Sequence, residues 1–98
     1  MKLAEIIANL GNADDELCIV AKLPWTPDSD ARLTSLTEQF RVPADVLAEG
    51  YAYFLEVHIA LEDVLGERAS RLSDNQRVDA IIFYAENDAY PEWLNAMG

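Results

Sequence analysis

Cysteine and histidine each occur once in this sequence, so a Cys–His nucleophilic pair would have to consist of Cys18 and His58. Such a pair needs the two side chains within hydrogen-bonding reach of each other and a third group that orients the base. Cys18 lies in the short apolar run 17–22, and no motif surrounds either residue. We therefore expect Cys18 to be a buried, inert thiol and His58 to face solvent at the edge of a strand. The sequence predicts no catalytic residue.

The acidic residues form no pattern typical of a metal or catalytic site. Glu62 and Asp63 are adjacent, but neighbours on a helix point about 100° apart and so cannot share a site. Asp28 and Asp30 resemble the opening of a calcium-binding loop, but the third ligand position falls on Arg32 and no glycine follows. A single cysteine excludes an internal disulfide and a four-cysteine zinc site. We expect no bound metal and no cofactor.

The chain is strongly acidic: its 98 residues include 18 Asp and Glu and 7 Lys and Arg, a formal net charge of -11 at pH 7. Such a charge repels nucleic acid and anionic membranes, and it attracts basic proteins. The sequence has no Lys/Arg cluster for phosphate contacts, no secretory signal pattern and no apolar run near the roughly 20 residues of a membrane span. We expect a cytoplasmic protein that binds a basic protein partner and contacts neither nucleic acid nor membrane directly.

The segment 78–93 contains four aromatic residues, four carboxylates and no basic residue. It falls in a predicted helix over 73–90, which begins with a Ser73–Gln76 capping box and ends at Tyr90-Pro91. Helical spacing gives this helix an apolar core stripe of Val78, Ile81, Ile82, Ala85 and Ala89. A second line along the helix carries Asp79, Phe83, Glu86 and Tyr90.

Aromatic rings beside carboxylates are typical of a surface that binds a basic protein. The rings supply contact area, and the carboxylates orient the partner and speed its association. We therefore predict that Asp79, Phe83, Glu86 and Tyr90 form a partner-binding face. The alternative is that Phe83 and Tyr90 pack on a neighbouring helix or on the sheet.

Trp25 is a further candidate for contact with a partner. It stands between Pro24 and Pro27, in a loop that the two prolines stiffen. Trp25 is either an anchor presented beside Asp28 and Asp30 or a cap on the edge of the core. We include all three residues in the predicted partner-binding set.

Hydrophobic periodicity predicts the elements that position these residues. Helices are expected over 2–10, 42–50, 60–72 and 73–90, and strands over 17–22, 31–36 and 51–59. In 51–59 the residues alternate with a period of two, which is typical of a strand with one largely polar face. An uninterrupted helix over 48–65 is the alternative there. The order of elements predicts an α+β fold: a single domain over 1–98, with a two- or three-stranded sheet covered by helices on one face.

Three groups of residues along the chain carry a resemblance to a known group of proteins: Trp25, Thr26 and Asp28; Glu62, Asp63 and Val64; and Phe83, Tyr84, Asn87, Asp88, Ala89 and Tyr90. Together they resemble a group of small acidic bacterial proteins of unknown function, similar in type to the immunity proteins that bacteria keep beside toxins. Pro91 stands where that group would have an apolar residue. The resemblance implies a bacterial, cytoplasmic, non-enzymatic protein and supplies no catalytic residue.

The expected function is that of an acidic inhibitor or immunity-type factor that masks a basic surface of a partner protein. The nucleic-acid groove of a nuclease toxin is such a surface, and carboxylates would take the place of phosphates there. One alternative is a phage-encoded inhibitor of a host defence nuclease. Another is an accessory module that forms a homodimer through its C-terminal aromatic residues.

Overall fold

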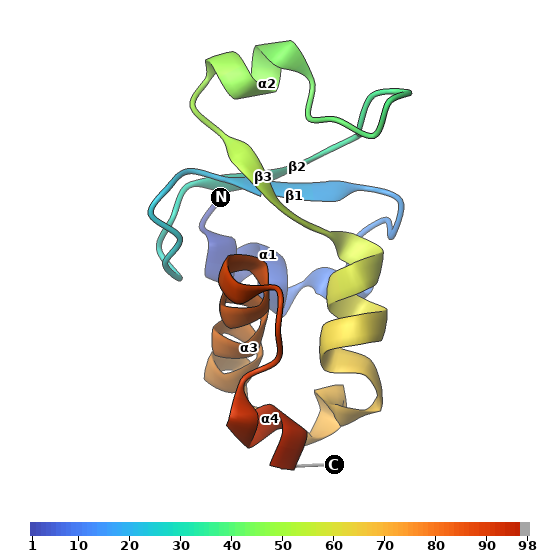
Figure 1. Cartoon of the computed structure of the whole chain (residues 1–98), viewed down its shortest axis with the longest axis vertical. Coiled ribbons are helices and arrows are strands. Elements are labelled where there is room, and N and C mark those ends of the chain that lie inside the picture. Colours follow the sequence, from blue (N-terminus) through green and yellow to red (C-terminus); the bar gives the residue numbers. More distant parts are fainter. Residues whose placement is uncertain (97–98) are drawn as a thin grey trace.

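Three short strands form an antiparallel sheet in the order β2-β1-β3. They are β1 (Cys18–Ala21), β2 (Ala31–Thr34) and β3 (Ala52–Glu56). The structure is a computed structural model that describes residues 1–96. It confirms the predicted α+β fold, with strands where the sequence indicates them (Figure 1).

Most of the helical segments cover one face of the sheet (Figure 1). They are α1 (Leu3–Ala8), the short 3-10 turn η1 (Leu10–Asn12), the π-helix η2 (Ile59–Leu65), the 3-10 helix η3 (Gly66–Arg71), α3 (Asp74–Asn87) and α4 (Glu92–Ala96). Their apolar side chains and those of the sheet form the main core, which includes Leu3, Ile19, Phe54, Ile81 and Leu94. These helices therefore pack against the lower face of the sheet in the view of Figure 1.

The opposite face of the sheet is covered as well, by α2 (Ala44–Ala48) and the chain on either side of it (Figure 1). A smaller core forms there from Cys18, Val20, Val42 and Val46. Side chains in a strand alternate between the two faces, and all four residues of β1 are apolar and buried. Both faces of the sheet therefore need cover, whereas the sequence predicted helices on one face.

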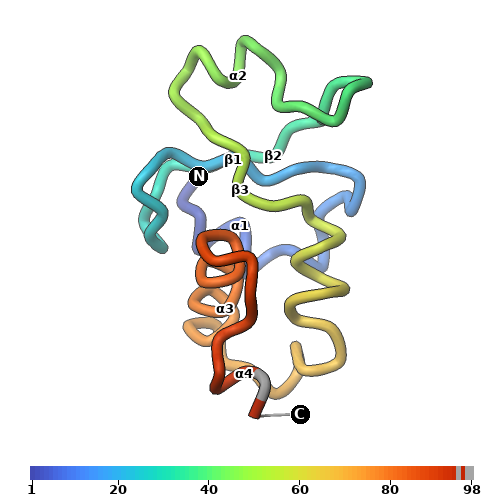
Figure 2. The backbone as a smooth tube through the Cα atoms, in the orientation of Figure 1, coloured from blue at the N-terminus to red at the C-terminus, as the bar shows by residue number. Residues whose placement is uncertain are grey.

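Strand β3 ends earlier than the sequence predicted and runs directly into helix, as Figure 2 shows. The pairing with β1 shifts between Ile19 and Val20, so that Val20 lies opposite Tyr53 and Ile19 opposite Leu55. Phe54 is the extra residue of this bulge, and both Phe54 and Leu55 are buried in the main core. The alternation in 51–59 put Phe54 on the same, largely polar face as Glu56 and His58, and that prediction is wrong for Phe54. The strand-then-helix interpretation is right, and the uninterrupted helix over 48–65 is excluded.

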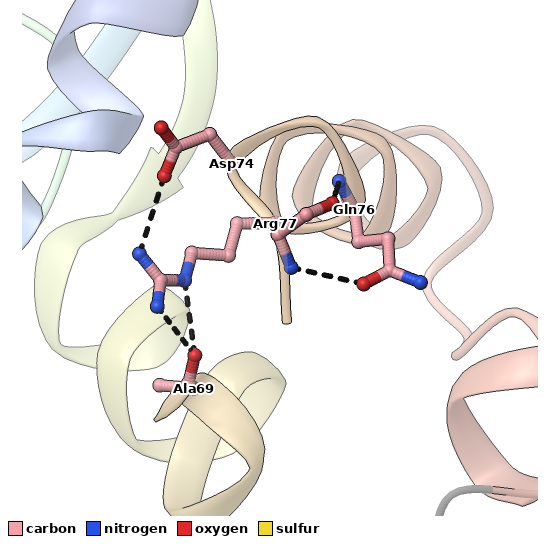
Figure 3. A network of polar contacts seen from close by, with 5 residues as sticks. Ala69, Asp74, Gln76 and Arg77 are labelled. Carbon is pink, nitrogen blue, oxygen red and sulfur yellow. Dashed lines mark hydrogen bonds and ion pairs between the residues drawn. The ribbon is translucent and has the colours of Figure 1, made fainter. Parts of the chain in front are cut away.

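The start of α3 is fixed by its cap and by an arginine that reaches the preceding helix. The backbone N–H of Gln76 donates to the Ser73 hydroxyl at 3.2 Å, and the backbone N–H of Ser73 donates to the Gln76 side chain at 2.9 Å, which confirms the predicted capping box. Arg77 donates from Nε and Nη2 to the Ala69 carbonyl at 3.0 and 2.6 Å, and its Nη1 lies 3.5 Å from Asp74 (Figure 3). These bonds hold α3 against η3.

The end of α3 differs from the prediction, because the helix stops at Asn87 and does not continue to Tyr90. Asp88 takes a left-handed conformation with φ 56°, and its backbone N–H donates to the Tyr84 carbonyl at 2.8 Å. Of the predicted core stripe, Val78, Ile81 and Ile82 are buried, Ala85 is partly buried, and Ala89 lies beyond the helix and is exposed.

The buried side of α3 gives a first prediction. Replacing Ile82 by alanine should lower the free energy of unfolding by about 2–5 kcal/mol, because the change removes buried methyl groups and leaves a cavity. Urea unfolding followed by circular dichroism measures this loss. Glu86→Lys, on the exposed side of the same helix, is the control and should change the free energy of unfolding by no more than about 0.5 kcal/mol. Equal losses for the two variants would show that the core does not lie where the structure places it.

Candidate functional site: an acidic cleft at one end of the sheet

The register of the sheet brings three segments that are distant in sequence to the same end. Cys18, the first residue of β1, lies opposite Thr34, the last residue of β2, and opposite Glu56, the last residue of β3. The chain before β1, the chain after β2 and the chain after β3 therefore meet there. This is the right-hand end of the sheet in Figure 1.

These segments enclose a cleft of about 670 Å³. Such a volume is within the range of roughly 300–1,000 Å³ that is typical of binding pockets. The cleft is lined by Asp14, Asp15, Glu16, Leu17, Ser35, Leu36, Thr37, Phe40, Glu56, His58 and Glu62. The lining thus has five carboxylates and no lysine or arginine. Arg41 follows Phe40 in the chain but does not line the cleft.

The bases that form ion pairs lie elsewhere on the molecule. Lys2 pairs with Asp28 at 3.4 Å, and Lys22 pairs with Asp30 at 3.8 Å, both beyond the far end of β1. Within residues 1–96, none of the five cleft carboxylates takes part in an ion pair. The cleft is therefore a locally uncompensated region of negative charge, open to a cation from outside the chain.

Two groups near Glu56, the Tyr53 hydroxyl and the Cys18 thiol, have raised pKa values. The Tyr53 hydroxyl donates to Glu56 at 3.4 Å. Burial, together with the negative charge of Glu56, raises the pKa of Tyr53 to about 12. The same two causes, in the same order, raise the pKa of the Cys18 thiol to about 12.

Phe40 is the apolar feature of the cleft. Its side chain is 80% exposed, the largest exposed fraction among the big apolar side chains of residues 1–96. Its backbone is left-handed, with φ 59°, which is uncommon for a bulky residue. The loop that carries it is closed by bonds from Thr37 N–H to the Arg41 carbonyl (2.8 Å) and from Phe40 N–H to the Thr37 carbonyl (2.9 Å). The fold thus holds a large aromatic side chain in water at the rim of the cleft.

The structure shows no hydrogen bond between Cys18 and His58. The Cys18 thiol is fully buried and lies near two backbone acceptors, the Ile19 carbonyl at 3.4 Å and the Leu55 carbonyl at 3.9 Å. His58 is half-buried in the first helical turn after β3 and lines the cleft, whereas the sequence predicted a solvent-facing strand residue. The prediction of a buried Cys18 is confirmed. That of His58 is wrong, because the chain turns helical at Val57.

Trp25 caps the core and is not presented to solvent. Its ring packs edge-on against Phe54 with centroids 4.9 Å apart, and its Nε1–H donates to the Ala21 carbonyl at 3.3 Å. Asp28 and Asp30 are exposed beside it, but both are paired with lysines. The loop lies at the opposite end of the sheet from the cleft, because Ala21 pairs with Ala31 and Ala52 there.

The predicted face of α3 is present only in part. Asp79, Phe83 and Glu86 are exposed, with Phe83 at 39%. Tyr90 lies beyond the helix and packs back on the molecule: its hydroxyl donates to the Asp63 carbonyl at 3.0 Å, and its ring centroid lies 5.2 Å from that of Tyr84. Tyr90 therefore joins the C-terminal segment to η2. It lies off the predicted face because α3 ends at Asn87.

The sequence reasoning did not find the cleft. The acidic run Asp14-Asp15-Glu16, directly before a predicted strand, was the available signal. The sequence does not reveal the register of the strands, and this register brings the acidic run close to Glu56 and Glu62. The exposure of Phe40 has no signal in the sequence, because aromatic residues are usually buried.

A scan against protein-family models, a search of curated proteins and a search of solved structures each give no match to this chain. The resemblance to small acidic bacterial proteins therefore stays a prediction. In the part of the chain that the structure describes, no helix has both the length and the apolar character needed to cross a membrane. Within residues 1–96, no group of three His, Cys, Asp or Glu side chains is arranged to hold a metal ion.

The contrast between Phe40 at the rim of the cleft and Phe54 in the main core gives a second prediction. Phe54→Ala should lower the free energy of unfolding by about 3–5 kcal/mol, because the ring is almost fully buried. Phe40→Ala should change it by no more than about 0.5 kcal/mol, because the ring packs on little of the molecule. Chemical unfolding of both variants makes the comparison. A large loss for Phe40→Ala would show that the ring is part of the core.

Cys18 gives a third prediction. At pH 8 the folded protein should not react with iodoacetamide, because the thiol is buried and a pKa of about 12 leaves almost no thiolate. Protein unfolded in urea should react at that pH. The pKa of Cys18 in the folded protein lies above the ordinary value of 9.0. The contribution of the protonated thiol to the free energy of unfolding is therefore present below pH 9 and is lost as the pH rises towards 12. Rapid labelling of the folded protein, measured by mass spectrometry, would contradict this placement.

Proposed function

We propose that this chain is a non-enzymatic binding protein that docks its acidic cleft on a basic surface of a partner protein. The observation that supports this proposal is the cleft itself, whose lining has five carboxylates from three segments and no lysine or arginine. Like charges that line one cleft repel one another, and a basic partner would offset that repulsion.

The arrangement supports binding better than catalysis. Asp14, Asp15, Glu16 and Glu62 are exposed, so their charges remain solvated until a partner arrives. The only thiol lies in the apolar interior with a raised pKa, which is the opposite of an activated nucleophile. Exposed carboxylates of this kind steer a basic protein towards the site and raise the rate of association.

The partner that we favour is a nuclease toxin or another nucleic-acid-binding protein, whose groove is built to attract phosphates. Carboxylates from an acidic cleft would occupy such a groove in place of phosphates. This is the chemistry of an immunity protein beside a toxin, and equally of a phage inhibitor of a host defence nuclease. We place the chain in the first class, in a bacterial cytoplasm, because of the sequence resemblance described above.

A fourth prediction separates the cleft from the exposed face of α3, which is the second candidate for docking. Asp15→Lys and Glu86→Lys change the net charge by the same amount, one in the cleft and one on α3. Immobilised wild-type protein should capture a basic protein from a lysate of the native host. The captured protein, once identified and purified, should bind Asp15→Lys at least tenfold more slowly than wild type at low salt, and Glu86→Lys nearly as fast as wild type.

The two charge-reversal variants distinguish between the possible docking faces. If Glu86→Lys loses the partner and Asp15→Lys keeps it, the docking face is α3, as the sequence first indicated. If neither change has an effect, charge does not direct binding, and the proposed function is wrong. Thermal melts of both variants should match the wild type, since both residues are exposed. DNA and RNA serve as further controls, because saturable retardation of either by the wild-type protein would contradict the choice of a protein partner.

A further inference from the structure

The rim of the cleft combines two kinds of group that seldom face water together. Phe40 presents an aromatic ring that is 80% exposed, and Leu36 and Leu17 add apolar surface beside it. The five carboxylates belong to the same lining. A purely acidic surface needs no ring, and a purely apolar docking site would exclude the charges. An arginine side chain is complementary to both the carboxylates and the ring, because its guanidinium is a flat, weakly hydrated cation.

Residues 1–96 already contain this arrangement elsewhere, at Arg32 of β2. Arg32 donates from Nη1 to Glu49 at 3.0 Å, while its guanidinium carbon lies 5.7 Å from the centre of the Tyr51 ring. One arginine thus lies between a carboxylate and an aromatic face. The cleft offers the same two components, carboxylates and the Phe40 ring, and its lining contains no lysine or arginine.

We propose that the basic partner inserts an arginine side chain into the cleft, where its guanidinium pairs with the carboxylates and stacks on Phe40. This inference rests on the proposed function and names the group that the cleft recognises. The charge of the cleft is complementary to the guanidinium, and the apolar rim is complementary to its faces and to the aliphatic stem.

Arginine suits the cleft better than lysine for a physical reason. A guanidinium donates in its plane to carboxylates and at the same time stacks its face on a ring, whereas an ammonium is a compact, strongly hydrated charge. Lys22 does lie 5.1 Å from the Tyr51 ring centre, so a ring alone does not select between the two cations. The selection comes from ring and carboxylates acting on one planar group.

The experiment uses the full chain and two labelled peptides of equal length and charge, one with alternating glycine and arginine and one with alternating glycine and lysine. Fluorescence anisotropy at 50 mM salt measures both dissociation constants. The arginine peptide should bind the wild-type protein about fivefold more tightly, which corresponds to about 1 kcal/mol of cation–π interaction. Phe40→Leu, which keeps apolar bulk without a ring, should remove this preference and leave the lysine peptide unaffected. Phe40→Tyr should keep it.

The outcomes that overturn the inference are separate from those that overturn the proposed function. Equal affinity for the two peptides, or a preference that survives Phe40→Leu, shows that the cleft recognises charge alone, and the proposed function still stands. Failure of both peptides to bind also overturns the inference. In that case the comparison of Asp15→Lys with Glu86→Lys on the captured partner still decides the proposed function by itself.

Discussion

The antiparallel register that sets Cys18 between Thr34 and Glu56 is the constraint on which the rest of this structure depends. A slip of one residue would exchange the two faces of β1, sending Val20 towards the helices and Ile19 towards α2. It would also separate the three segments that form the cleft. The bulge at Phe54 belongs to the same constraint, because it keeps both Phe54 and Leu55 in the core while Tyr53 stays outside. The pairings of β1 with β2 and with β3 thus set both the core packing and the placement of the acidic residues.

The distribution of charge follows from this architecture. Lysines at one end of the sheet pair with Asp28 and Asp30, while the carboxylates of the cleft at the other end have no ion-pair partner within residues 1–96. Exposure to water and salt screens their mutual repulsion and lets the chain fold with a net charge of -11. The unpaired carboxylates of the cleft are the feature on which the proposed recognition of a basic surface rests.

The local features of this fold could be read from the sequence, and the distant pairings could not. The Ser73 cap, the buried strand at Cys18 and the strand-to-helix change in 51–65 depend on neighbouring residues, and they are confirmed. The end of α3 was misplaced because periodic spacing continues past Asn87, and only the left-handed Asp88 breaks it. That single residue moves Tyr90 from the predicted face to a contact with Asp63. The cleft depends on strand register, and no local pattern encodes it.

We propose that the acidic cleft, and not the face of α3, receives the basic partner. The most direct measurement is an NMR titration of the isotope-labelled chain with the alternating glycine–arginine peptide, with each backbone amide followed individually. We expect the shifted amides to cluster in 14–17, 35–40 and 56–62, the three segments of the cleft. Shifts confined to 79–86 on α3, with the cleft amides unchanged, would contradict it.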